Sequence, residues 1–171
     1  MVAAGVYMMV RMSFVVTASP LAAEIIAGIG CGTALLAALM PIVSALGGNA
    51  GTQTLAVMVR ALATNQLTSS NTLRMLAREF QIALCNGGAL GLVGAVGSYV
   101  ILGNLQLSIV FAIAMVINSI VAGLVGVIVP VALDKANVDP AVSSAVFVTT
   151  ATDVMGFFSF LGLAALWGLS A

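Results

Sequence analysis

The stretch that decides the fold is Leu107–Leu133, LSIVFAIAMVINSIVAGLVGVIVPVAL, which contains no charged side chain. About 20 largely apolar residues suffice for a helix to cross a hydrocarbon core roughly 30 Å thick, so this stretch predicts a transmembrane helix. The whole chain is similar in composition, because 62% of its 171 residues are hydrophobic and only 6% are charged. Its mean hydropathy is +1.24, whereas a soluble domain carries about 25% charged residues. The sequence therefore predicts an integral membrane protein, and its zero net charge indicates no nucleic-acid partner.

Four further apolar stretches are long enough to span a membrane, so we predict an all-α membrane protein with five transmembrane helices. They form a single transmembrane domain, residues 1–171, with spans at about 2–23, 25–60, 80–102, 107–133 and 141–169. The second span is too long for one upright helix, because about 35 residues at 1.5 Å each reach roughly 50 Å. It must be tilted, project beyond the bilayer or be interrupted. Pro41 and the glycine-rich stretch Gly47–Gly51 mark the expected site of a bend or close approach.

The charges between the spans predict the orientation in the membrane. The connection Arg60–Glu79 carries three arginines, and the connection after the fourth span carries Lys135, whereas the Gly103–Asn104 turn is uncharged. Basic connections stay in the cytoplasm. We therefore expect the N-terminus in the cytoplasm and the C-terminus outside, in the inner or plasma membrane.

Asp153 is the one acidic residue that this division places deep inside a span after the first. A carboxylate near the middle of a bilayer costs at least about 2.5 kcal/mol, so such residues face a cavity or a partner. Thr149 lies four residues before it, Thr152 directly before it and Gly156 three residues after it. On a 3.6-residue period the four share a helix face, which predicts a polar surface around Asp153.

The second predicted span supplies another polar surface, because Asn49 and Gln53 are four residues apart, as are Gly48 and Thr52. The adjacent glycines would let backbone carbonyls approach a ligand, although they could also serve helix packing. Because amides accompany the glycines, we favour a functional role for this surface.

Other small residues at helical spacing favour packing alone, because such spacing lets helices approach closely in lipid. Gly87 and Gly91 are four residues apart, as are Ser119 and Gly123. We expect Asn86 and Asn118 to form hydrogen bonds across helix interfaces. Cys31 and Cys85 lie within apolar runs, where a thiol acts as a small hydrophobic group.

The residue types indicate which ligand the polar surfaces would bind. The chain contains no histidine, and oxygen ligands without imidazole or thiolate suit a hard cation such as magnesium, which keeps several waters and takes one or two carboxylates. A symmetric dimer would bring two copies of Asp153 to one divalent ion. The alternatives are a proton or sodium site in a coupled carrier, a structural pair between Asp153 and Arg11, or a membrane subunit that transports nothing. Enzymatic motifs such as G-x-S-x-G and H-E-x-x-H are absent, so we expect no enzyme.

Two long motifs carry a family resemblance. Met40–Val43, Gly47–Gln53 and Val59–Arg60 resemble the second membrane helix of the MgtE magnesium transporters. Asp139–Ala141 and Thr149–Phe158 resemble the fifth membrane helix of that family. The resemblance begins near residue 37 and extends to the C-terminus. The cytoplasmic N-terminal domain and paired CBS domains usual in the family have no counterpart that we recognise in residues 1–171.

The resemblance implies a homodimeric magnesium channel of five helices per chain, with its pore at the dimer axis and lined by helices two and five. It implies that Asp153 binds the transported Mg²⁺ with most of its hydration shell kept, that the carbonyl of Thr149 faces the same ion, and that Asn49 lies in the pore. The implied partners are a second copy of the chain, membrane lipid and divalent metal ions. The remaining residues that we expect to line the pore are Gly47, Gly48, Thr52, Gln53, Thr150, Thr152 and Gly156.

Overall fold

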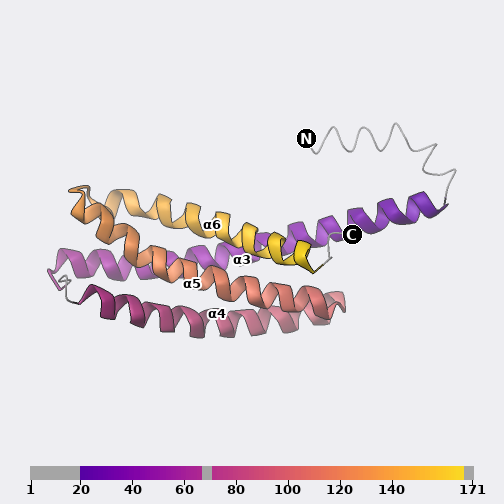
Figure 1. Cartoon of the computed structure of the whole chain (residues 1–171), viewed down its shortest axis with the longest axis horizontal. Helices are drawn as coiled ribbons and strands as arrows, with labels where there is room; N and C mark the ends of the chain where they lie inside the picture. Colours follow the sequence, from indigo (N-terminus) through magenta and orange to yellow (C-terminus); the bar gives the residue numbers. More distant parts are fainter. Residues whose placement is uncertain (1–19, 67–70, 168–171) are drawn as a thin grey trace.

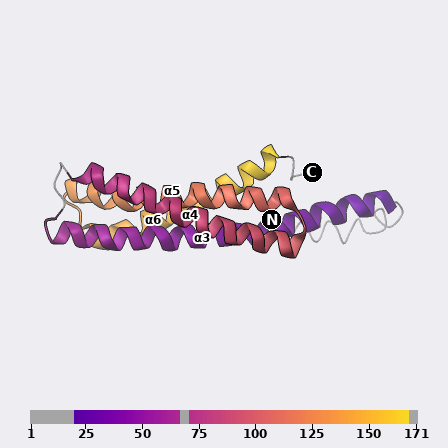
Figure 2. The same ribbon diagram turned by 90° about the horizontal axis from the view of Figure 1, so that it is seen from below.

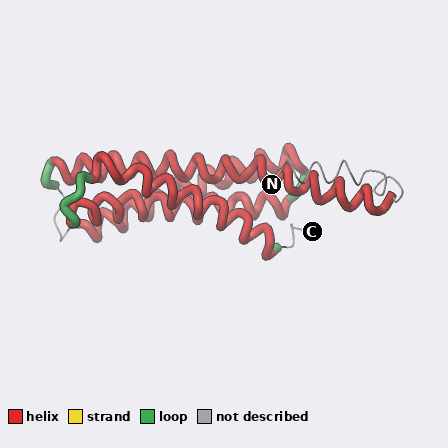
Figure 3. Tube along the Cα trace, turned by 90° about the horizontal axis from the view of Figure 1, so that it is seen from above, coloured by secondary structure: helices red, strands yellow, loops and turns green. Residues whose placement is uncertain are grey.

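The computed structural model describes residues 20–66 and 71–167, and every regular element within them is a helix (Figure 3). Each of these helices is long and apolar enough to cross a membrane, which confirms a helical, multi-pass membrane protein. The predicted first span, residues 2–23, lies almost wholly outside the described residues, together with Arg11. The helices are α3 (Pro20–Ala63), α4 (Thr72–Leu102), α5 (Leu105–Lys135) and α6 (Pro140–Leu166).

The turns between helices follow from local capping chemistry. Gly103 ends α4 with φ 66°, a left-handed conformation that glycine adopts without strain, and its N–H donates to the Tyr99 carbonyl at 2.8 Å. The side chain of Asn104 then accepts from the Leu107 N–H at 3.1 Å and begins α5. Asp139 caps α6 in the same way, and Pro140 occupies the first turn, where its missing N–H is not needed.

The long second segment is one continuous helix of 44 residues. At 1.5 Å per residue α3 is roughly 66 Å long, and it remains helical through Pro41 and the glycine-rich stretch Gly47–Gly51. Of the three alternatives for this segment, an interruption of the helix is therefore excluded. The N-terminal part of α3 instead projects beyond the ends of the other helices, as two perpendicular views show (Figures 1 and 2).

The start of α4 differs from the sequence-based prediction. We expected the polar connection to continue as far as Glu79 and the third span to begin at Phe80, but α4 begins at Thr72. The apolar run marks the residues suited to the hydrocarbon core, whereas Leu73–Glu79 contains good helix formers that continue the helix through its polar flank. Glu79 consequently belongs to the helix and is buried in the bundle.

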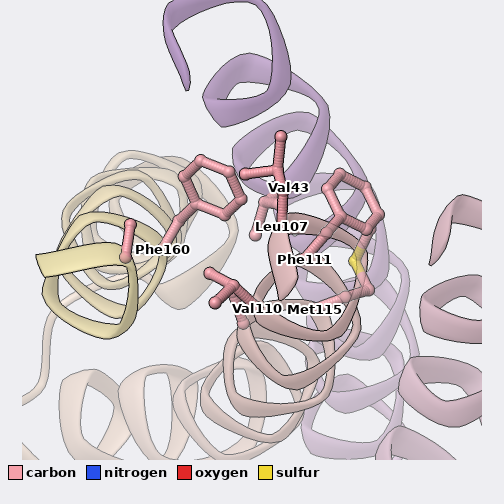
Figure 4. Packing of buried hydrophobic residues seen from close by; sticks show 8 residues of the cluster. Val43, Leu107, Val110, Phe111, Met115 and Phe160 are labelled. Atoms are coloured by element: carbon pink, nitrogen blue, oxygen red, sulfur yellow. The ribbon is translucent and has the colours of Figure 1, made fainter. Parts of the chain in front are cut away.

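Helix α5 is the centre of the bundle, because it packs against α3, α4 and α6, and α3 also packs against α6. Phe111 on α5 and Phe160 on α6 meet edge to face with ring centroids 6.3 Å apart, next to Val43 of α3 (Figure 4). Small residues bring α4 against α5, since a Cβ at Gly91 would lie 3.0 Å from the Ala112 carbonyl oxygen. The packing role predicted for these small residues is confirmed.

Candidate cation site around Asp153

Asp153 lies on α6, and its side chain is exposed in the single chain. The hydroxyl of Ser44, on α3, donates a hydrogen bond to its Oδ1. No basic side chain within residues 20–66 and 71–167 forms an ion pair with it. The alternative pairing with Arg11 lies outside the described residues. Within the described residues the carboxylate is therefore held by one hydroxyl and has no charged partner.

Glycines in both motifs allow α3 and α6 to approach closely enough for this contact. A Cβ at Gly156 would lie 3.1 Å from the Ser44 Cα, and one at Gly51 would lie 2.7 Å from a methyl carbon of Val148. Gly48 faces Thr152, whose hydroxyl oxygen would be 3.6 Å from such a Cβ. In this chain the glycines thus act first as packing residues that bring Ser44 to Asp153.

Asn118 of α5 lies behind this contact and is fully buried. Its Nδ2 donates to the Val43 carbonyl at 2.8 Å, which confirms the predicted hydrogen bond across a helix interface. A Cβ at Gly47 would lie 2.1 Å from the same nitrogen, and one at Gly156 would lie 3.1 Å from it. The amide therefore occupies the point where α3, α5 and α6 meet, and the glycines at positions 47 and 156 leave room for it. Its Oδ1 has no hydrogen-bond partner in the part of the chain that the structure describes.

The threonine hydroxyls on α6 donate to their own helix. Thr152 is fully buried, and its hydroxyl donates to the carbonyls of Val148 at 3.1 Å and Thr149 at 2.9 Å. The Thr149 hydroxyl donates to the Ala145 carbonyl at 3.0 Å. The predicted ligand, the Thr149 carbonyl oxygen, thus already accepts one side-chain hydrogen bond. Thr149 is half-buried and Thr150 is exposed, and their contact with an ion stays a prediction.

The predicted residues of α3 do not all lie on one surface. Asn49 is exposed, and its carbonyl accepts from the Thr52 hydroxyl at 3.0 Å. Gln53 instead lines a cavity between α3, α4 and α5, next to Glu79. The structure therefore places Gly48, Thr152 and Gly156 at the α3–α6 contact with Asp153, and it separates Gln53 from them.

Sequence reasoning missed two polar residues. Ser44 lies four residues before Gly48, so helical spacing alone could have placed it on the face that meets α6. Glu79 was assigned to a connection, but it is buried on α4. Asp153 is therefore not the only carboxylate within the bundle. Glu79 accepts a hydrogen bond from Thr54 at 3.0 Å, and only the continuation of α4 through Thr72–Glu79 reveals this contact.

The chemistry of the site is that of oxygen ligands around one carboxylate. Within the described ranges, no three His, Cys, Asp or Glu residues cluster as a metal site. Hydroxyl, carbonyl and carboxylate oxygens favour hard cations that keep part of their water. Fold and site together define a class: a multi-pass helical membrane protein with an intramembrane carboxylate suited to a cation.

Comparison with known proteins gives the family. Residues 40–163 match the MgtE family, described as a divalent cation transporter. The chain is 34% identical to the magnesium transporter MgtE of Bacillus subtilis (strain 168) over 129 residues, 75% of this chain and 29% of that protein. It is 35% identical to the magnesium transporter MgtE of Enterococcus faecalis over 133 residues, 78% of this chain and 29% of that protein. The chain belongs to the MgtE family of divalent cation transporters. This is a family of transporters and not of enzymes, as the sequence predicted.

A third relative matches a similar share of the chain. The magnesium transporter MgtE of Thermus thermophilus is 34% identical over 131 residues, which cover 77% of this chain and 29% of that protein. The chain thus spans less than a third of the length of the curated relatives it matches.

Proposed function

We propose that this chain forms the ion-conducting part of a magnesium channel, in which two copies enclose a pore lined by α3 and α6. One observation carries the proposal: Asp153 is exposed, has no ion pair within the described residues, and lies in a helix otherwise suited to lipid. A carboxylate in this position is not stable against hydrocarbon. A second copy that covers this face would give it a water-filled, polar surrounding.

The two-fold arrangement also suits the ion. Two copies of Asp153 would present two negative charges to one divalent cation, which matches the one or two carboxylates that magnesium takes in proteins. The Ser44 hydroxyl orients each carboxylate, while the Thr149 carbonyl and Asn49 supply further oxygens to the ion or its waters. The relatives that are 34% and 35% identical over the matched residues are named magnesium transporters, which supports magnesium as the cargo.

The driving force would be the membrane potential. Moving two charges across 100 mV is worth about 4.6 kcal/mol, at about 2.3 kcal/mol per charge. The basic connections would place the N-terminus in the cytoplasm. Because the potential is negative inside, magnesium would move into the cell. Such uptake needs no coupled ion.

The test is flux through the purified full chain in liposomes that contain a magnesium indicator. The proposal predicts Mg²⁺ entry that rises with imposed inside-negative voltage and does not change with a proton or sodium gradient. Flux that follows either gradient at zero voltage would instead indicate a coupled carrier. Liposomes that take up no Mg²⁺ at any voltage, although they contain folded protein, would indicate a subunit that transports nothing.

A further inference from the structure

The second carboxylate within the helix bundle, Glu79, has no role in the site around Asp153. It lies on α4, where only 9% of its surface is exposed. Its Oε2 accepts a hydrogen bond from Thr54, on α3, at 3.0 Å. Within residues 20–66 and 71–167 no basic side chain forms an ion pair with it, and the adjacent Arg78 is exposed. Glu79 is thus a buried acid with one neutral partner.

Glu79 lines a cavity of about 200 Å³ between α3, α4 and α5. Since a water molecule in the liquid occupies about 30 Å³, this space has room for several waters. The polar side chains that line it come from all three helices, and the cavity is otherwise bounded by apolar residues such as Val57 and Ile82. The polar residues are Gln53, Thr54, Glu79, Asn86 and Ser119.

The lining has the composition of a hard-cation site. It offers one carboxylate, the hydroxyls of Thr54 and Ser119, and the amide oxygens of Gln53 and Asn86. Thiolates and imidazoles are missing from this lining. A buried carboxylate is stable only when it is paired with a positive charge or protonated. Magnesium is bound through one or two carboxylates while it keeps several waters, so a cavity larger than the bare ion suits it.

The cavity is separate from the Asp153 site. Ser44 and Gly48 of α3 face α6, whereas Gln53 and Thr54 of α3 face the cavity. Helix α3 therefore lies between the two carboxylates. The cavity is also nearer the end of the bundle where α3 ends at Ala63 and α4 begins at Thr72, the end that the basic connection assigns to the cytoplasm.

We propose that this cavity is a second binding site for a hydrated divalent cation, with Glu79 as its one charged ligand. The identity of the cation as magnesium rests on the proposed function, but the existence of the site does not. Asn86 and Gln53 hold the waters of the ion, and Thr54 orients the carboxylate. The opposing account is a protonated Glu79, which donates its own hydrogen bond and binds no ion.

The test is binding of Mn²⁺, a paramagnetic substitute for Mg²⁺, to the purified full chain in lipid nanodiscs, measured by electron paramagnetic resonance. Asp153→Asn removes the first site from consideration, and the remaining Mn²⁺ binding is compared with that of Asp153→Asn/Glu79→Gln. We expect the second change to weaken this binding at least about tenfold, the scale of ligand-shell changes in metal sites. Added Mg²⁺ should displace the Mn²⁺. In the same background Glu24→Gln, which removes an exposed glutamate of α3, should change nothing.

A second variant keeps the test valid if Glu79→Gln destabilises the bundle. Asn86→Leu retains the charge and removes an amide from the cavity, and it should also weaken Mn²⁺ binding while the melting temperature stays near that of the parent. Equal Mn²⁺ affinity with and without Glu79 overturns the proposal, as does a Glu79 infrared band of a protonated acid that persists at saturating Mg²⁺. Neither result depends on whether Mg²⁺ passes through a pore at Asp153, because the flux measurement tests the proposed function separately.

Discussion

At the scale of single residues, the site around Asp153 is built from one carboxylate and the groups that hold it. The Ser44 hydroxyl donates to the carboxylate from α3, and buried Asn118 fixes α3 through the Val43 carbonyl directly before Ser44. Ser44 thus acts on the carboxylate itself, whereas Asn118 acts on the position of the helix that carries Ser44. The two residues should therefore fail in different ways when they are changed.

Ser44→Ala removes the hydrogen-bond donor but little volume. Because a partner of a metal ligand orients it, we expect weaker apparent affinity for Mg²⁺, by about tenfold or less, with an unchanged melting temperature. The measurement is the Mg²⁺ concentration that gives half-maximal flux in liposomes. Thr33→Ala, which changes an exposed α3 hydroxyl bonded only to its own helix at Ile29, is the matched control. An unchanged half-maximal concentration in Ser44→Ala would contradict the orienting role.

Asn118→Ala removes the hydrogen bond to Val43 and leaves a cavity where three helices meet. We expect a loss of about 1–3 kcal/mol of stability, because the lost contact and the cavity both act against the folded state. Thermal denaturation in detergent measures it. Asn71→Ala is the control, since Asn71 is exposed and makes no side-chain cap hydrogen bond. Equal melting temperatures for the two variants would show that Asn118 does not join the helices.

At the scale of helices, glycines set the distances between helix axes. Gly126 of α5 meets α3 so closely that a Cβ there would lie 2.9 Å from the Thr54 Cβ and 3.0 Å from the Gly51 carbonyl oxygen. Backbone does not yield as a flexible side chain does. Gly88 of α4, by contrast, faces open space. Replacement of glycine by alanine should therefore lower the stability of the fold at Gly126 but not at Gly88.

We expect Gly126→Ala to destabilise the bundle by about 1–3 kcal/mol, the range typical of overpacking. Gly88→Ala should leave the melting temperature unchanged or raise it slightly, because alanine favours the helix. The measurement is again thermal denaturation, with both variants in the same detergent. A tolerant Gly126 would mean that α3 and α5 lie farther apart than the structure places them.

At the scale of the whole molecule, the helical membrane fold follows directly from the sequence, because long apolar stretches such as Leu107–Leu133 have few alternatives in lipid. The sequence also indicated Asp153, since one charge in an apolar span is conspicuous. It did not reveal which helices would be neighbours, so it did not show that Gln53 lines a cavity together with Glu79, and the place of Gln53 in the pore stays a prediction. Glu79 was missed because apolar runs show where hydrocarbon begins, whereas the helix continues beyond that boundary.

The central claim at this scale is that Asp153 binds the cation in a pore shared by two copies. A single chain leaves this carboxylate exposed, and a carboxylate exposed at the middle of a membrane requires a polar surrounding. A second copy would supply it, together with the second charge that a divalent ion favours.

The most direct measurement is voltage-driven Mg²⁺ flux into liposomes containing Asp153→Asn, compared with Asp134→Asn, in which the neutralised aspartate is exposed in the last turn of α5. The change replaces one carboxylate oxygen by an NH₂ group of similar size and removes the negative charge of the side chain. The account predicts flux at the level of empty liposomes for Asp153→Asn and unchanged flux for Asp134→Asn, with both proteins folded and dimeric. Flux through Asp153→Asn equal to that of the parent chain would contradict it.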